Sequence, residues 1–215
     1  MKNIILFDLD GTLTDPGEGI TNSVAYALEK WGINVSDKKQ LYPFIGPPLV
    51  DSFMQIYGFS KDKAEKSVAF YREYFSQKGI FENMVIDGVQ DMLKTLKENG
   101  KNLLICSSKP QEFTEKILAH FELNKYFDNI VGASMDEKRS QKEDIIAYAV
   151  EKYKLNIKDT VMVGDRKYDV FGGHANGIIS VGVTYGYGDY EELKNADAEF
   201  IVDSVAQLKQ LLLQI

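Results

Sequence analysis

The sequence is poor in the residues that cross-link small folds or bind soft metals. Its 215 residues include one cysteine, Cys106, and two histidines, His120 and His174. A single cysteine excludes an intramolecular disulfide, and two histidines so far apart have no metal-ligand spacing. Because Cys106 lies inside an apolar run, we interpret it as a core residue rather than a nucleophile.

Two larger features are also missing, a long apolar run and a basic stripe. No segment reaches the ~18 apolar residues of a membrane-spanning helix, and the N-terminal MKNIILFD reaches an acidic residue too soon for a signal peptide. Asp and Glu outnumber Lys and Arg by 32 to 25, which gives a net charge of -7, and the lysines are scattered. We therefore expect a cytoplasmic protein, a monomer or weak dimer, with no nucleic-acid or membrane partner.

What the sequence does contain is an alternation of two patterns. Short apolar runs between polar residues are typical of buried strands. They occur at residues 4–7, 103–106, 129–131, 161–164, 180–183 and 200–202. Apolar residues at helical spacing lie between them, at residues 89–96, 113–121, 145–153 and 205–212. The alternation predicts an α/β fold in which helices cover both faces of a parallel sheet.

One long segment, residues 15–84, breaks this alternation and shows helical spacing without a strong strand. Its first helix is marked by Asp15 as N-cap, Pro16 at the first helical position and Gly32 past the end. The stretch YPFIGPPL, residues 42–49, should form a stiff turn incompatible with helix. We predict an inserted all-helical cap domain over residues 15–84 and a core domain made of residues 1–14 and 85–215.

Polar side chains stand where three of the predicted strands end. Asp8 and Asp10 follow the first run, Ser107 the second and Asp165 the fourth, with Asp169 four residues beyond. In an open parallel sheet, ligands bind beyond the carboxyl ends of the strands, so these groups should converge. Two carboxylates about 4 Å apart repel by roughly 4 kcal/mol at a surface-like dielectric. A cluster of oxygen ligands without His or Cys favours Mg²⁺ over zinc.

The residues after Asp10 suit an anion. Gly11 has no Cβ, and we expect free backbone N–H groups at Gly11 and Thr12 that allow a phosphate to approach closely.

Taken in this order, the residues resemble the haloacid dehalogenase-like hydrolases, and the resemblance spans essentially the whole chain. The family's motifs have counterparts in Asp8–Thr12 (DLDGT), Ser107 (ICSSKP), Lys142 (RSQKEDII) and Gly164–Asp169 (GDRKYD). Lys109, which follows Ser107 closely, is an alternative to Lys142. The resemblance implies a doubly wound, Rossmann-like core with a helical cap, and Mg²⁺ as cofactor.

It also implies roles for single residues. Asp8 would attack a phosphomonoester to form an aspartyl-phosphate, and Asp10 would protonate the leaving alcohol and then deprotonate water. The implied metal ligands are Asp8, the backbone carbonyl of Asp10, Asp165 and Asp169. The implied phosphate-binding residues are Gly11, Thr12, Ser107, Ser108 and Lys142.

An intact Asp10 points to a phosphatase or a phosphomutase within this family. The cap loop and the downstream GVTYGYG resemble the phosphoglycolate phosphatase and bacterial 5'-nucleotidase branches, which act on small phosphorylated metabolites. Candidate specificity residues are Phe44, Gly46 and Pro47, with Tyr42 and Tyr187 as further candidates. Ile86-Asp87-Gly88 and Gly173-His174 depart from the commoner pattern. The alternatives are a mutase of the β-phosphoglucomutase type and a non-catalytic sensor of phosphorylated metabolites.

Overall fold

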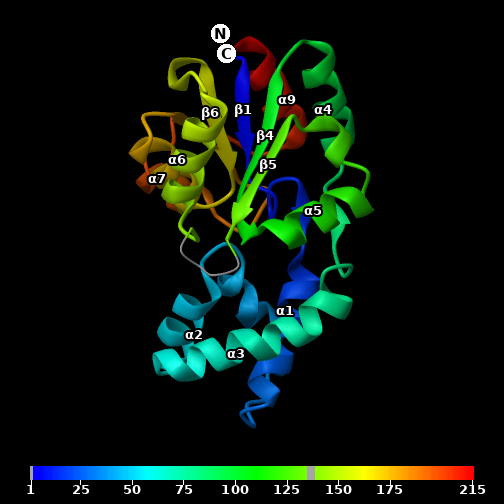
Figure 1. The fold of residues 1–215 in the computed structure, drawn as a ribbon, viewed down its shortest axis with the longest axis vertical. Helices are drawn as coiled ribbons and strands as arrows, with labels where there is room; N and C mark the ends of the chain where they lie inside the picture. Colours follow the sequence, from blue (N-terminus) through cyan, green and yellow to red (C-terminus); the bar gives the residue numbers. More distant parts are fainter. Residues whose placement is uncertain (1, 135–138) are drawn as a thin grey trace. The chain divides into compact units, whose positions relative to one another are not determined.

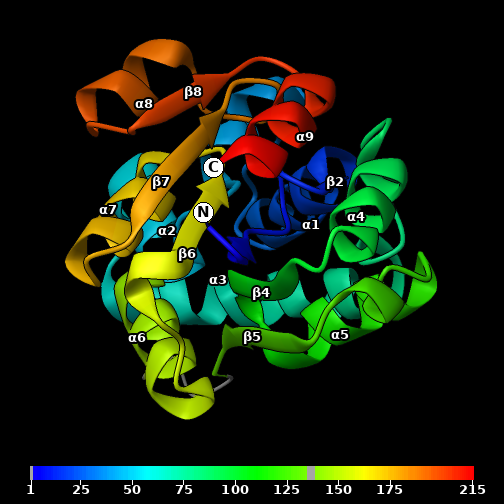
Figure 2. The same cartoon turned by 90° about the horizontal axis from the view of Figure 1, so that it is seen from above.

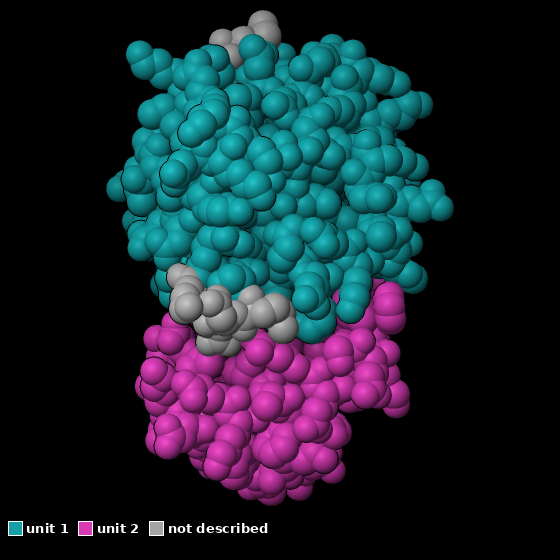
Figure 3. All heavy atoms as spheres, in the orientation of Figure 1, with its two compact units in different colours: residues 1–14, 85–215 teal, residues 15–84 magenta. Residues whose placement is uncertain are grey.

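The computed structural model describes residues 2–134 and 139–215. The chain divides into two compact units, coloured teal and magenta in Figure 3. Unit 1 comprises residues 1–14 and 85–215, and unit 2 comprises residues 15–84, the segment predicted as the helical insert. Within the described ranges, no helix has both the length and the apolar character needed to cross a bilayer.

Unit 1 is built on a six-stranded parallel sheet with the strand order β5-β4-β1-β6-β7-β8. The strands are β1 (Ile4–Phe7), β4 (Asn102–Pro110), β5 (Asn129–Ala133), β6 (Thr160–Gly164), β7 (Ile179–Val183) and β8 (Phe200–Val202). Each contains one of the six apolar runs, which confirms the predicted parallel α/β fold. From β1, strands β4 and β5 are added on one side and β6, β7 and β8 on the other. The order of the strands therefore reverses at β1, and open α/β sheets bind ligands at such a reversal.

Helices cover both faces of this sheet (Figures 1 and 2). One face carries α4 (Val89–Glu98), α5 (Gln111–His120) and α9 (Val205–Gln214), and the other carries α6 (Lys142–Tyr153) and α7 (Lys167–Ala175). The short α8 (Tyr190–Asn195) precedes the edge strand β8. In this doubly wound arrangement the sheet is packed between two layers of helices, which hold the ends of its strands in place.

The core beneath α6 shows why the strands hold their register. Ile145 and Ile146 of α6 pack with Leu104 of β4 and Met162 of β6, and all four side chains are fully buried. Full burial of such a side chain contributes about 1.5–3 kcal/mol. Cys106 belongs to the same cluster and is fully buried, as predicted for a core residue.

Unit 2 is predominantly helical. Its elements are α1 (Gly17–Glu29), the 3₁₀ helix η1 (Lys38–Phe44), α2 (Leu49–Tyr57), α3 (Lys61–Tyr74) and the π turn η2 (Phe75–Gly79). Aromatic rings fill its centre: the centroids of Phe44 and Phe53 lie 4.9 Å apart, and Phe53 stacks on Phe59 at 6.0 Å. The chain enters this unit through β2 (Thr14–Asp15) and leaves it through β3 (Met84–Val85), which pair in a two-stranded sheet.

Two local predictions in unit 2 need correction. Helix α1 begins at Gly17, one residue later than predicted, although Asp15 still accepts the Gly17 N–H at 3.0 Å. The turn predicted over residues 42–49 is wrong at both ends: its first three residues finish η1, with Pro43 inside it, and Leu49 begins α2. A 3₁₀ helix tolerates this proline because its φ is close to the angle that the pyrrolidine ring imposes.

Candidate active site

Asp8 occupies the end of the central strand. The register places Phe7 beside Ile105 of β4 and Val163 of β6, so the next residue leaves the sheet between its two neighbours. The Asp8 N–H donates to the Val163 carbonyl at 2.9 Å, and the residue is only 5% exposed. Its carboxylate is therefore held at the switch point of the sheet.

Asp165 and Asp169 join Asp8 there. Asp165 directly follows β6, and Asp169 lies in the first turn of α7, where its Oδ2 accepts the Arg166 N–H at 3.1 Å. All three aspartates are buried, and one ligand oxygen from each lies within 4.8 Å of the others. The structure thus brings these three predicted metal ligands together.

Lys142 lies among these carboxylates as the first residue of α6. Its ammonium is 2.8 Å from Asp8 Oδ1 and 2.7 Å from Asp169 Oδ1, and it donates to the Cys106 carbonyl at 3.0 Å. A cation at a helix N-terminus opposes the helix dipole, so the carboxylates must hold it there. Burial alone would lower the pKa of Lys142, but Asp169 and Asp8 outweigh burial and raise it.

The alternative lysine, Lys109, also reaches the site, but it pairs with a different carboxylate. Its ammonium is 2.5 Å from Asp10 Oδ2, with both side chains largely buried. Ser107, which is 2% exposed, accepts the Lys109 N–H through its hydroxyl at 3.3 Å. Asp8 and Asp10 are thus held by separate lysines, and Ser107 lies beside the second pair.

Three carboxyl groups of the site have raised pKa values. Burial raises the pKa of Asp10 despite the opposing effect of Lys109. Burial, followed by the charges of Asp169 and Asp8, raises the pKa of Asp165 well above its usual range. Burial also raises the pKa of Asp169 to about 6, against the pull of Lys142. A nearby positive charge would relieve all three shifts.

The donor set fits a divalent cation. Among the described residues, the Asp165 Oδ1 atom has no hydrogen-bond partner, although it is fully enclosed. When all are ionised, the four aspartates and two lysines leave a formal charge of -2, which one divalent ion would cancel. Oxygen-only ligation of this kind suits Mg²⁺. At Gly11, whose φ is +81°, a Cβ would lie 2.2 Å from Asp165 Oδ2, so only glycine fits against this carboxylate.

The expectation of free N–H groups after Asp10 is wrong in this structure. The Gly11 N–H donates to the Thr14 carbonyl at 2.7 Å, and the Thr12 N–H donates to Leu9 at 3.3 Å. The tight turn closes its own hydrogen bonds, which sequence spacing does not reveal. The Thr12 hydroxyl is buried and has no partner within the described parts of the chain, while Ser108 is half-buried on β4.

The predicted specificity residues belong to unit 2 and differ in exposure. Phe44 is 1% exposed and packs on Phe53, so its first role is in the aromatic core. Gly46 has φ +107°, which favours glycine, and Pro47 is half-buried. Tyr42 is 41% exposed. A substrate contact by this loop stays a prediction.

Sequence reasoning missed how the chain after β7 reaches the site. Tyr187 was a candidate for its side chain, but it is its backbone N–H that donates to Asp165 Oδ2, at 2.7 Å. The Tyr185 hydroxyl donates to the Thr12 carbonyl at 3.1 Å. The closely spaced glycines of GVTYGYG were the available signal, because glycine permits backbone to approach a ligand or another strand.

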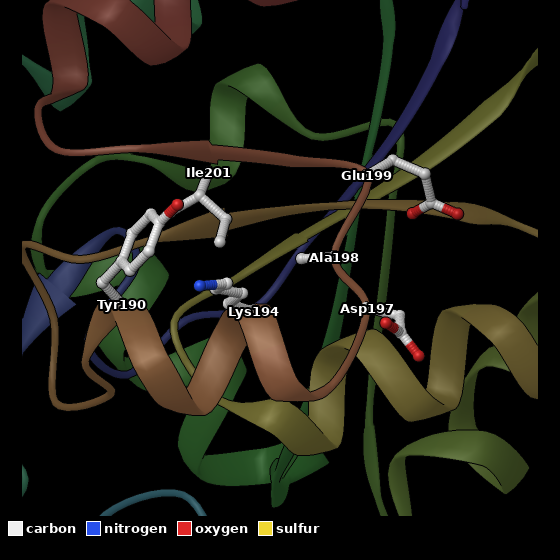
Figure 4. A pocket seen from close by; sticks show the side chains of 6 residues that line it. All are labelled: Tyr190, Lys194, Asp197, Ala198, Glu199 and Ile201. Atoms are coloured by element: carbon white, nitrogen blue, oxygen red, sulfur yellow. The ribbon is translucent and has the colours of Figure 1, made fainter.

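Unit 1 also has a surface pocket that is lined by other residues. Its lining residues are Tyr190, Lys194, Asp197, Ala198, Glu199 and Ile201 (Figure 4). In the figure Tyr190 and Lys194 rise from α8, and Ile201 projects from β8. It contains none of the predicted site residues, so we assign it no part in the chemistry.

The fold and the site together are those of an α/β enzyme with an acidic centre beyond its first strand. The chain belongs to the haloacid dehalogenase-like hydrolase family, because the sequence model of that family matches residues 5–183. It is 42% identical over 208 residues to a 5'-nucleotidase of Pseudomonas aeruginosa, covering 97% of this chain and 94% of the relative.

Two solved structures share the whole architecture. One is a predicted phosphatase from Clostridium acetobutylicum, with 51% identity, a TM-score of 0.98 and full coverage of both chains. The other is a putative phosphatase from Clostridium difficile, with 46% identity, a TM-score of 0.87 and 98% coverage of both chains.

Proposed function

We propose that this phosphatase of the haloacid dehalogenase-like family hydrolyses phosphomonoesters of small metabolites in the cytoplasm, with Mg²⁺ as cofactor. One observation carries the proposal: Asp8 and Asp10, two residues apart, are paired with two different lysines. A nucleophile must be ionised while a general acid must carry a proton, so the two carboxylates need different surroundings. Their surroundings do differ: burial raises the pKa of Asp10 despite its pairing with Lys109, whereas Asp8 shares Lys142 with Asp169.

The chemistry assigned to these residues has two steps. Asp8 attacks phosphorus, the bond from phosphorus to the ester oxygen breaks, and Asp10 gives its proton to the leaving alkoxide. Water then attacks the aspartyl-phosphate, Asp10 takes the water's proton, and Asp8 is released together with inorganic phosphate. Ser107 and Lys142 would hold the phosphoryl oxygens, where preorganised charge is usually the largest rate contribution.

The candidate ligands for Mg²⁺ are Asp8, Asp165 and the Asp10 backbone carbonyl, with Asp169 beside them. When bound, the ion would lower the repulsion between the nucleophilic carboxylate and the phosphate dianion. The buried Asp165 Oδ1, which has no hydrogen-bond partner within the described residues, supports this assignment.

For the substrate we propose a nucleoside 5'-monophosphate, with phosphoglycolate as the second choice. The name of the Pseudomonas aeruginosa relative supports this order. Release of inorganic phosphate from a panel of nucleoside monophosphates, phosphoglycolate and sugar phosphates would test it. A higher kcat/KM for phosphoglycolate would reverse the order, and isomerisation of a sugar phosphate without phosphate release would favour the mutase alternative.

The mechanism is tested by Asp10→Asn, which keeps the size and backbone carbonyl of the residue but cannot exchange the proton. General acid–base catalysis is worth roughly 10² to 10⁴-fold, so hydrolysis of alkyl phosphates should fall by that factor. Nitrophenol leaves without protonation. With p-nitrophenyl phosphate we therefore expect a burst of at most one equivalent of nitrophenol, followed by slow turnover as the aspartyl-phosphate accumulates.

The matched control is Asp8→Asn, which should give no burst because the nucleophile is gone. If Asp10→Asn hydrolyses alkyl and aryl phosphates at the wild-type steady rate, Asp10 is not the acid–base residue. If no phosphate ester is turned over by the wild-type chain, the sensor alternative replaces the enzyme.

A further inference from the structure

Residues 184–188, which lead from β7 towards α8, bring their backbone against Asp165. We call this segment the Tyr187 loop. Its first residue is anchored to the sheet, since the Thr184 N–H donates to the Val202 carbonyl of β8 at 3.0 Å. Further along, the Tyr187 N–H donates to Asp165 Oδ2 at 2.7 Å. The loop is therefore hydrogen-bonded to the edge strand at one end and to a single oxygen of Asp165 near the other.

Two glycines make this approach possible. A Cβ at Gly186 would lie 2.4 Å from the Gly11 carbonyl oxygen and 2.5 Å from Asp165 Oδ2. A Cβ at Gly188 would lie 2.0 Å from the Asp165 carbonyl oxygen. Real Cβ atoms do not approach other atoms this closely, so any side chain at either position would push the loop away from Asp165.

The two oxygens of Asp165 consequently have different surroundings. Oδ2 is occupied by the Tyr187 N–H, whereas Oδ1 is buried and accepts no hydrogen bond from the described residues. Asp165 itself is 1% exposed, so water does not replace the missing partner freely. Oδ1 is therefore the oxygen of this carboxylate that is open to a cation without competition from a hydrogen bond.

We propose that the Tyr187 loop is a positioning element that restricts Asp165 to coordination through one oxygen and so selects Mg²⁺ against Ca²⁺. Mg²⁺ needs six ligands at about 2.0–2.1 Å in a near-octahedral arrangement, which one-oxygen carboxylates satisfy. Ca²⁺ takes six to eight ligands at longer distances and commonly binds a carboxylate through both oxygens. A loop that holds an N–H on Oδ2 competes with a cation for that oxygen, and so disfavours the two-oxygen binding that Ca²⁺ commonly uses.

This inference rests on the proposed Mg²⁺ site, and metal binding tests both without any enzyme assay. The affinities of the full chain for Mg²⁺ and Ca²⁺ are measured by isothermal titration calorimetry without substrate. Electron paramagnetic resonance of Mn²⁺ serves as an independent probe of the same site. The variants are Gly186→Ala and Gly188→Ala. The control is Gly100→Ala in the same unit, where φ is +74° and a Cβ would meet nothing within 4 Å.

In the two loop variants the Kd for Mg²⁺ should rise by about 10- to 100-fold, the usual cost of losing a group that orients a ligand. The Kd for Ca²⁺ should change much less or fall, since Oδ2 is released. Gly100→Ala should lower the melting temperature, because an alanine at positive φ is strained, and leave both affinities unchanged.

A further variant decides the matter if the alanines do not fold. Replacing Tyr187 with its α-hydroxy acid analogue substitutes an ester for the amide, which removes the N–H donor and adds no bulk. It should show the same loss of preference for Mg²⁺. Wild-type preference in the ester variant, or an equal loss in Gly100→Ala, overturns the loop's role. Failure of the wild-type chain to bind Mg²⁺ or Mn²⁺ overturns the metal site itself.

Discussion

Lys142→Met removes a lysine whose ammonium contacts both Asp8 and Asp169. The side chain is 4% exposed, so the variant leaves two buried carboxylates without their partner. Breaking a buried ion pair by removing one member costs about 3–5 kcal/mol. For a chain of 150–250 residues, 1 kcal/mol corresponds to about 2–4 °C in melting temperature, so the metal-free variant should melt about 6–20 °C lower.

Two comparisons make this result specific. Lys109→Met also deletes a buried lysine, but it removes the ion-pair partner of one carboxylate, Asp10, instead of two. It should therefore lower the melting temperature less. Mg²⁺ should raise the melting temperature of Lys142→Met more than that of the wild type, because the ion supplies the charge that the lysine supplied.

The assay is differential scanning calorimetry of the three proteins at pH 7, with EDTA and then with excess Mg²⁺. Both lysine variants should also be assayed for phosphate release, and Lys142→Met should lose more activity, since we place Lys142 at the phosphoryl group. A Lys142→Met protein that melts within 2 °C of the wild type would refute the reasoning. A larger loss in Lys109→Met would assign the phosphate-binding role to Lys109.

Three further outcomes are expected. Chelation should abolish activity and Ca²⁺ should restore little of it, since Ca²⁺ can bind Asp8 through both oxygens; equal rates with Ca²⁺ would contradict the metal assignment. Burial raises the pKa of Glu199, but hydrogen bonds from Ser180 and His174 outweigh it and lower that pKa. Glu199→Gln should therefore melt below the wild type near neutral pH, and the gap should close as acid protonates Glu199; a gap independent of pH would exclude this contribution. Burial raises the pKa of the Cys106 thiol to about 12, so a thiol reagent at pH 8 should label the denatured chain but not the native one, and rapid native labelling would contradict the core assignment.

The sequence predicted those parts of the fold and site in which side chains carry the information. Apolar runs such as IILF are readable as buried strands because both faces of a parallel sheet exclude water, and β1 has the predicted bounds. Lys109 was harder to place: it lies two residues after Ser107, inside the stretch of β4 where the register against β5 shifts, so strand alternation does not determine the side of its side chain. Its nearness to Ser107 in sequence made it the second choice, yet its ammonium pairs with Asp10 in the site.

Contacts made by the backbone were not predictable in the same way. The Tyr187 N–H has no residue-type signature, because every residue except proline carries the same donor. The paired N–H groups of Gly11 and Thr12 and the 3₁₀ turn at Pro43 depend on local closure of hydrogen bonds that spacing does not encode. Glycines are the indirect record of such contacts, as Gly186 and Gly188 show.

The pairing of β2 with β3 has a consequence for how such a protein can diversify. Because these strands are neighbours, the chain leaves unit 1 and returns to it at adjacent points. All the acidic, basic and hydroxyl groups assigned to the chemistry lie in residues 1–14 and 85–215. An insertion whose ends meet can be lengthened, shortened or exchanged without moving the strands that flank it. Unit 2 can therefore change in length and sequence without altering the residues assigned to the reaction.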